Sequence, residues 1–73
     1  MKNFYATFGQ KYAREEHPVL PAAHPDSYVT IRAKTLEEAH ERLQDKIGNH
    51  YSFLYTEENF DKDLHPRGSI VTL

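Results

Sequence analysis

The feature that most constrains the fold of this chain is a helix signal with both ends marked, over residues 35–48. Thr35 is a favoured N-cap residue, and Glu38 three positions later gives the capping-box pattern. Gly48 is placed to end the helix, because glycine adopts the left-handed conformation that closes many helices. The apolar residues between these ends form one narrow stripe of Leu36, Ala39, Leu43 and Ile47. A stripe of this width favours packing against one face of a sheet.

Segments with the period-two pattern of β-strands lie on both sides of this helix. They cover residues 4–9, 28–33, 51–55 and 70–73. If the strands flanking the helix run parallel, with a right-handed crossover, the first strand fits between them, antiparallel to both. We therefore predict a single α+β domain over residues 1–73, with a small three- to four-stranded, mostly antiparallel sheet and one helix on one face. The predicted order is strand, loop, strand, helix, strand, strand.

The composition excludes several classes of function. The 73 residues contain no cysteine, which excludes disulfides, thiolate zinc sites and cysteine nucleophiles. The net charge of −2 is too balanced for a general nucleic-acid binder, which carries a basic excess, so nucleic acid is not an expected partner. No stretch approaches the roughly 20 apolar residues of a membrane span, and the N-terminus lacks the apolar region of a secretory signal. The expected location is the cytoplasm.

The second face of the predicted sheet is expected to be open, because one helix covers only one face. The period-two alternation assigns to this face the candidate partner-binding residues Tyr5, Tyr28, Arg32 and Leu54. Two interpretations stay open. The face is either solvated, with cross-strand Tyr–Thr pairs, or it is an aromatic patch that binds a partner or a second copy of the chain.

Residues 10–27 form a long loop between the first two predicted strands. The loop exceeds the length of about 12–15 residues beyond which irregular loops are uncommon, and three prolines restrict it. We interpret it as an ordered flap across the sheet that covers the second face. The alternative is that it completes a core too small to close otherwise. The loop adds four candidate partner-binding residues, Tyr12, His17, His24 and Asp26.

The histidines of the loops raise two chemical alternatives. Imidazoles and a carboxylate can bind zinc or another divalent ion, and the candidates are His17, His24, Asp26 and His65. Their spacing matches no ligand pattern, so neither a metal site nor a cofactor is predicted. His24 and Asp26 resemble an acid/base pair, but such neighbours arise by chance in a chain with five histidines and eleven acidic residues. Without a nucleophile elbow or a phosphate-binding glycine-rich loop, the chain is not predicted to be an enzyme.

A second loop, at residues 56–64, is acidic. It lacks the turn glycine of a calcium-binding loop. We interpret it either as a solvated turn or as an acidic edge that meets a basic partner surface.

The order of short motifs along residues 3–60 resembles small uncharacterised proteins of actinobacterial bacteriophages and prophages. The motifs that carry the resemblance are FYATFGQ (4–10), HPVLP (17–21), AHPD (23–26), YVTI (28–31), TLEEA (35–39) and YSFLY (51–55). The resemblance implies a protein made in an infected cell and located in the host cytoplasm, where small accessory proteins often bind and block host machinery.

These observations together predict a non-enzymatic protein-binding phage accessory or host-interaction factor, whose partner is a host or phage protein and whose effect is inhibition of a host or defence protein. One alternative is a self-associating structural protein, a homodimer that buries Tyr5, Tyr28 and Leu54 of its open sheet faces. The other alternative is a small metal-binding protein that uses the His-Pro loops.

Overall fold

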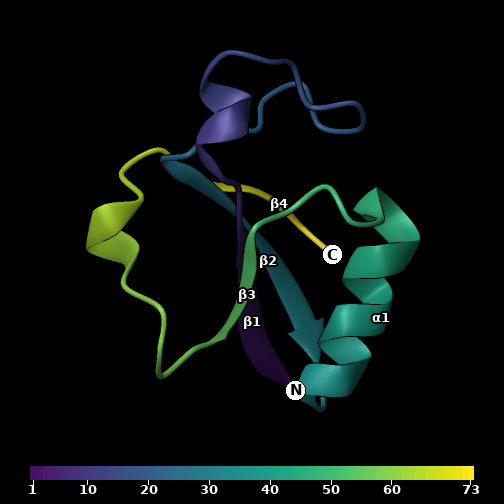
Figure 1. Cartoon of the computed structure of the whole chain (residues 1–73). Coiled ribbons are helices and arrows are strands. Elements are labelled where there is room, and N and C mark those ends of the chain that lie inside the picture. The colour runs from purple at the N-terminus through teal and green to yellow at the C-terminus, as the bar shows by residue number, and fades with distance from the viewer.

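The computed structural model describes all of residues 1–73 as a four-stranded sheet with one α-helix (Figure 1). The elements along the chain are β1 (Lys2–Thr7), a 3₁₀ turn (Gln10–Ala13), β2 (Ser27–Ala33), α1 (Leu36–Ile47), β3 (Phe53–Thr56), a second 3₁₀ turn (Lys62–Leu64) and β4 (Gly68–Thr72). The predicted α+β class, element order and single helix are confirmed.

The strands lie in the order β3-β1-β2-β4. β1 is antiparallel to both β2 and β3, whereas β4 is parallel to β2. The first strand therefore lies between the two strands that flank the helix, as predicted, and two of the three strand pairs are antiparallel. The chain reaches β4 last and adds it outside β2, so β3 and β4 are the two edges of the sheet.

The helix α1 begins and ends where the sequence predicts, between Thr35 and Gly48. The Glu38 amide donates to Thr35 Oγ1 at 3.1 Å, which satisfies one of the unpaired N–H groups of the first turn. The Glu38 carboxylate lies 3.2 Å from Arg42, one helical turn further on, and does not accept from the Thr35 amide, so only the first half of the predicted capping box forms. At the other end Gly48 has a φ of 60° and a ψ of −134°. This positive φ costs glycine little because it has no Cβ, but the ψ lies outside the left-handed helical conformation predicted for this residue.

The core lies between α1 and the sheet. Ala39, Leu43 and Ile47 of the helix are buried against alternate residues of the two central strands. Those residues are Phe4, Ala6 and Phe8 on the first strand and its extension, and Val29, Ile31 and Ala33 on the second. The predicted stripe is confirmed except at its first member, because Leu36 is 47% exposed.

The long loop of residues 10–27 packs on the helix side of the sheet. Tyr12, Leu20 and Ala23 contact the same core as α1. Figure 1 shows the loop across the end of the sheet where β1 ends and β2 begins. The interpretation of this loop as a flap over the second face is therefore wrong, and the alternative, that it completes the helix-side core, is correct. One 12-residue helix is too narrow to cover four strands, and the loop supplies the remaining apolar contacts.

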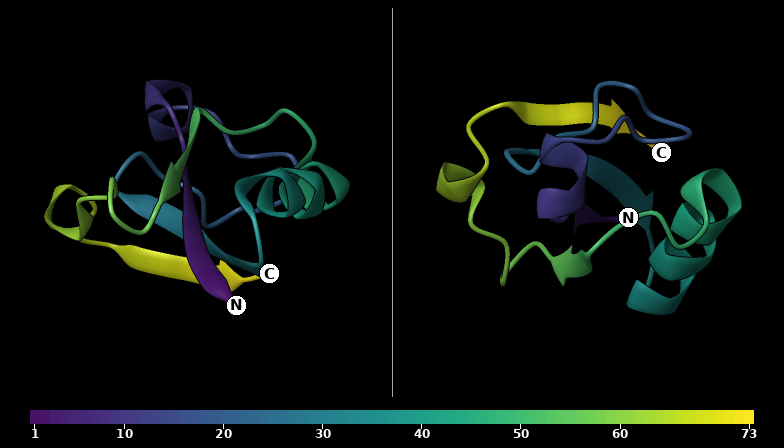
Figure 2. Two further views of the ribbon diagram at one scale, coloured as in Figure 1. Left: turned by 90° about the horizontal axis from the view of Figure 1, so that it is seen from below. Right: turned by 45° about the horizontal axis from the view of Figure 1, so that its top comes forward.

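The part of the second face around Tyr5 and Tyr28 is covered by the segment between β3 and β4, residues 57–67, whereas Phe53 and Arg32 stay exposed. In Figure 1 this segment arches out on the side of the sheet opposite α1, and Figure 2 shows the same separation from two further directions. Its Phe60 ring stacks on Tyr5 at a centroid distance of 4.6 Å and meets Tyr28 edge-on at 4.9 Å. Tyr5 and Tyr28 are only 3% and 8% exposed. The prediction that these two tyrosines lie on an open face is wrong, because an aromatic residue of the acidic loop covers them.

The strand after the helix presents its side chains in the opposite phase to the predicted one. Leu54 pairs with Ala6, and therefore lies on the helix side, where it packs against the core. Phe53 and Tyr55 pair with Thr7 and Tyr5 on the second face. The assignment of Leu54 to the open face is therefore wrong. A shift of one residue moves every side chain of a strand to the other face.

Candidate functional site

His17 is a structural residue of the long loop and is only 2% exposed. Its Nδ1 accepts hydrogen bonds from the amides of Val19 and Leu20, at 3.1 and 3.0 Å. Its Nε2 lies 2.6 Å from the carbonyl oxygen of His50. Because Nδ1 is an acceptor, the proton is on Nε2, which donates to that carbonyl. Both ring nitrogens are thus engaged in holding the loop to the end of α1, and neither is available to a metal or a partner.

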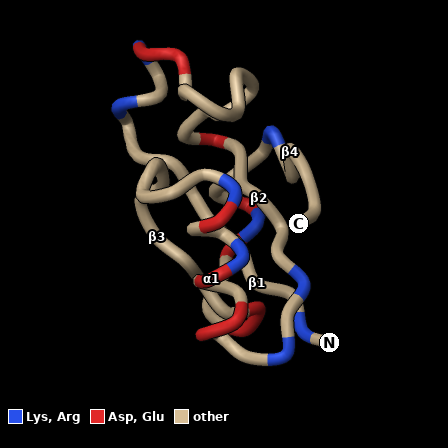
Figure 3. The backbone as a smooth tube through the Cα atoms, turned by 90° about the vertical axis from the view of Figure 1, so that its right-hand side faces the viewer, with Lys and Arg blue, Asp and Glu red and all other residues tan.

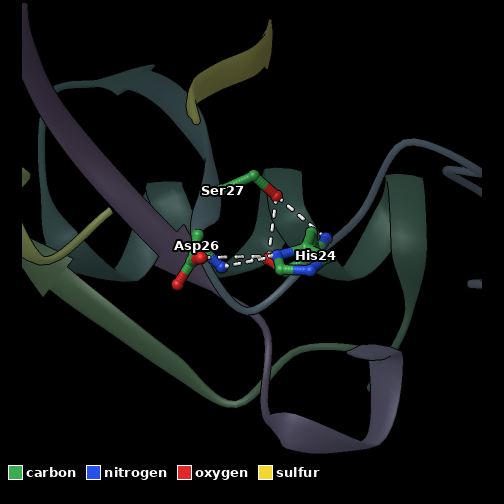
Figure 4. Close-up of polar contacts among 3 residues, drawn as sticks. All are labelled: His24, Asp26 and Ser27. Atoms are coloured by element: carbon green, nitrogen blue, oxygen red, sulfur yellow. Dashed lines mark hydrogen bonds and ion pairs between the residues drawn. The ribbon is translucent and has the colours of Figure 1, made fainter. Parts of the chain in front are cut away.

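His24, Asp26 and Ser27 lie together in a way that resembles a catalytic triad (Figure 4). The contacts are those of a tight turn instead. The Ser27 hydroxyl donates to the His24 carbonyl at 2.8 Å and accepts from the His24 amide at 2.9 Å. The His24 Nδ1 accepts from the Asp26 amide at 3.1 Å, so its lone pair faces the backbone. Ser27 is also only 2% exposed, which leaves its hydroxyl without access to a substrate.

The four metal candidates are not brought together. No group of three or more histidine, aspartate or glutamate side chains is placed to hold a metal ion. His65 lies on the other side of the sheet from His17, where it stacks on Phe60 at 5.1 Å. The structure gives the metal-binding alternative no ligand set.

The predicted partner-binding residues divide into buried and accessible ones. Tyr5, Tyr28 and His17 are buried, and Leu54 lies on the helix side. Arg32 is exposed and donates to Asn3 Oδ1 at 3.2 Å, whereas His24 and Asp26 are partly exposed within their turn. Tyr12 is half-buried against His17, at a ring distance of 4.7 Å. These residues do not share one surface. The interface of the dimer alternative is not formed either. Tyr5 and Tyr28 are buried, and Leu54 lies on the other face of the sheet.

A surface that the sequence does not predict lies between α1 and β3. Leu36, Glu37, His40 and Glu41 of the helix and Leu54 of the strand line an open hollow of ≈ 500 Å³, which we call the α1–β3 groove. It exists because the buried stripe of α1 rests on β2 while β3 is the far edge of the sheet, beyond β1. Figure 2 shows α1 lying to one side of β3.

A second hollow, of ≈ 510 Å³, adjoins this groove at Leu36. It is lined by charged residues of both signs, with Glu57 and Glu58 after β3 and Lys2 and Lys34 on the opposite side. Figure 3 shows acidic positions gathered near the start of α1, with basic positions near the N-terminus of the chain. The α1–β3 groove itself has two glutamates and no lysine or arginine in its lining.

One feature of the sequence could have indicated an exposed apolar residue at this groove. Leu36 is the first residue of the helix and so extends the apolar stripe beyond the part that β2 can cover. Phe60 is a lone aromatic residue in an acidic loop, and such a residue favours packing of its loop against apolar neighbours. Neither signal names the surface that the residue contacts.

No helix of this chain combines the length and the apolar character that crossing a membrane requires. Comparisons with protein-family models, with curated proteins and with solved structures found no significant match to the chain.

Proposed function

We propose that the chain is a small non-enzymatic protein-binding domain, which engages its partner through the α1–β3 groove. The resemblance to phage proteins adds the proposal that it is a phage accessory factor that binds and inhibits a host or defence protein. The observation that carries the binding proposal is the exposure of Leu36. It stays 47% exposed beside a hollow, whereas the other members of its stripe, Ala39, Leu43 and Ile47, are at most 2% exposed.

A partner side chain that filled the groove would bury Leu36 and Leu54 together. Burial of apolar surface contributes about 25 cal/mol per Å², and a few well-packed residues near the centre of an interface supply most of its binding free energy. The rim of Glu37, His40 and Glu41 supplies polar groups around this apolar centre, an arrangement typical of protein interfaces.

The fate of the polar side chains supports a binding function over catalysis. His17 and Ser27 use their polar atoms to hold the backbone of their own loop. A general base or a nucleophile needs a lone pair or a hydroxyl that faces substrate. The side chains that do face solvent around the groove are suited to contact a partner surface.

The test is capture of a partner with a matched pair of variants. Leu36→Ser and Val19→Ser remove apolar side chains of nearly equal exposure, 47% and 48%, but Val19 lies in the long loop, away from the groove. Proteins retained from a host lysate by the native chain are identified by mass spectrometry, and each is then titrated as a purified protein. We expect a partner whose affinity falls about tenfold or more with Leu36→Ser and is unchanged with Val19→Ser. A partner that binds both variants as tightly as the native chain would contradict the proposal.

A further inference from the structure

We propose that the α1–β3 groove takes an extended, basic peptide segment, which pairs with the outer edge of β3 and places one apolar side chain between Leu36 and Leu54. This inference rests on the proposed protein-binding function and deepens it, because it names the chemical class of the partner segment and the way it binds.

The outer edge of β3 is suited to pairing with another strand. β3 stands at the end of the sheet order, so its backbone groups on the side away from β1 have no strand partner. Its residues, Phe53–Thr56, include no charged residue and no proline, which are two of the devices that block pairing at an edge. Phe53 is 61% exposed beside this edge. An extended peptide that adds a strand gains main-chain hydrogen bonds, while its alternate side chains give specificity.

The other edge of the sheet lacks the pocket that such recognition needs. β4 is also free of charge, but none of the hollows of the molecule is lined by its residues. A strand added to β3 lies about 4.8 Å beyond it, and every second side chain of that strand points to the helix side. Those side chains enter the α1–β3 groove, where Leu54 is already half-buried at the floor.

The charges at the groove favour a basic partner segment. Glu37 and Glu41 flank the apolar floor, and the lining of the groove holds no lysine or arginine. Lysine or arginine side chains two positions either side of the buried apolar one would reach these carboxylates. A second copy of the chain would instead bring a second set of the same acidic side chains into the interface, and like charges there disfavour binding.

The test uses the intact chain and a labelled heptapeptide, Thr-Lys-Thr-Leu-Thr-Lys-Thr, whose lysines and leucine share one face of a strand. Its counterpart has glutamate in place of both lysines. Fluorescence anisotropy measures the two dissociation constants, and amide chemical shifts locate the peptide. We expect the basic peptide to bind at least about fivefold more tightly than the acidic one, with the largest shifts in β3.

Backbone pairing has its own control. Methylating the peptide amides at either the odd or the even positions removes the donors on one edge of the strand only. One of the two methylated peptides is expected to lose binding about tenfold or more and the other to keep it, because only one edge of the peptide faces β3. Equal behaviour of the two methylated peptides would overturn pairing with β3.

The preference for a basic segment is tested by reversing the charge of the two glutamates that line the groove. The double variant Glu37→Lys with Glu41→Lys is expected to bind the acidic peptide more tightly than the basic one. The matched control, Glu15→Lys with Glu16→Lys, makes the same change of net charge in the exposed long loop and is expected to keep the native preference. Circular dichroism of both variants verifies that they fold. Unchanged preference in the groove variant, or a dimer in sedimentation that Leu36→Ser dissociates, would overturn the inference.

Different results would contradict the basic-segment inference and the proposed binding function. A captured partner that depends on Leu36 but is indifferent to the Glu37 and Glu41 reversal would leave the function standing and remove the basic segment. A captured partner that is indifferent to Leu36, while the peptide still binds the groove, would remove the function alone.

Discussion

The two faces of the sheet are closed by different kinds of contact. The helix side is closed by α1 and by a loop whose backbone is held through the two nitrogens of His17. The second face is partly closed by an irregular segment whose Phe60 ring lies among Tyr5, Tyr28, Tyr55 and His65. Hydrogen bonds hold the loop of residues 10–27 in place, whereas stacked rings hold the segment of residues 57–67. Loss of a hydrogen-bonding group in a buried site leaves unpaired polar atoms, whereas loss of a ring leaves mainly a gap.

The largest expected effect comes from His17→Ala on the helix side. The change leaves the amides of Val19 and Leu20 and the carbonyl of His50 without their partner, and it also removes a buried ring. We expect a loss of about 3 kcal/mol in the free energy of unfolding, measured by urea denaturation. His24→Ala, in an accessible turn of the same loop, is the control and should cost less than half as much. Equal losses would show that His17 is not what holds the loop.

The second effect comes from Phe60→Ala on the opposite face. Because Phe60 is only partly buried, we expect a loss of about 2 kcal/mol, smaller than that of a fully buried phenylalanine. Tyr5 and Tyr28 should become accessible to nitration by tetranitromethane, as peptide mass spectrometry will show. Phe60→Leu keeps an apolar cover without the stacking and should protect both tyrosines while losing about 1 kcal/mol. Tyrosines that stay protected in Phe60→Ala would contradict the assignment of this segment as the cover.

The smallest expected effect comes from Lys62→Met, which removes a cation from the ring of Tyr5. The Lys62 Nζ lies 5.2 Å from the centroid of Tyr5, and we expect Lys62→Met to cost about 0.5 kcal/mol of unfolding free energy. High salt should reduce the loss caused by Lys62→Met and leave the loss caused by Phe60→Leu unchanged, because only the lysine contact involves a full charge. An unchanged midpoint of thermal unfolding would show that the cation contributes nothing to this face.

The sequence predicts those parts of the fold that depend on neighbouring residues. The caps at Thr35 and Gly48 and the stripe of Leu43 and Ile47 act within one helix, so their pattern is sufficient. The position of β1 between β2 and β3 follows from the direction of the strands that flank that helix.

What the sequence could not predict depends on contacts across the fold. Period-two alternation defines two sets of side chains but does not say which set faces the helix. At β3 the choice follows from its register with β1, in which Leu54 pairs with Ala6 and Tyr55 with Tyr5. The partner of His17 is a carbonyl 33 residues away, and Phe60 acts through rings from three strands. The α1–β3 groove was missed for the same reason, since it depends on Leu54 facing the helix.

The central position of β1 also has a consequence for how the chain folds. Phe4 pairs with Ile31 on one side and with Thr56 on the other, so neither partner of this strand is local. Pairings between distant residues carry a large loop-closure cost before they contribute stability, and they slow folding. On the ribosome, β1 must wait until the residues of β3 have left the exit tunnel before its second edge is protected. During that interval α1, whose caps are local, is the longest element whose hydrogen bonds lie within its own sequence.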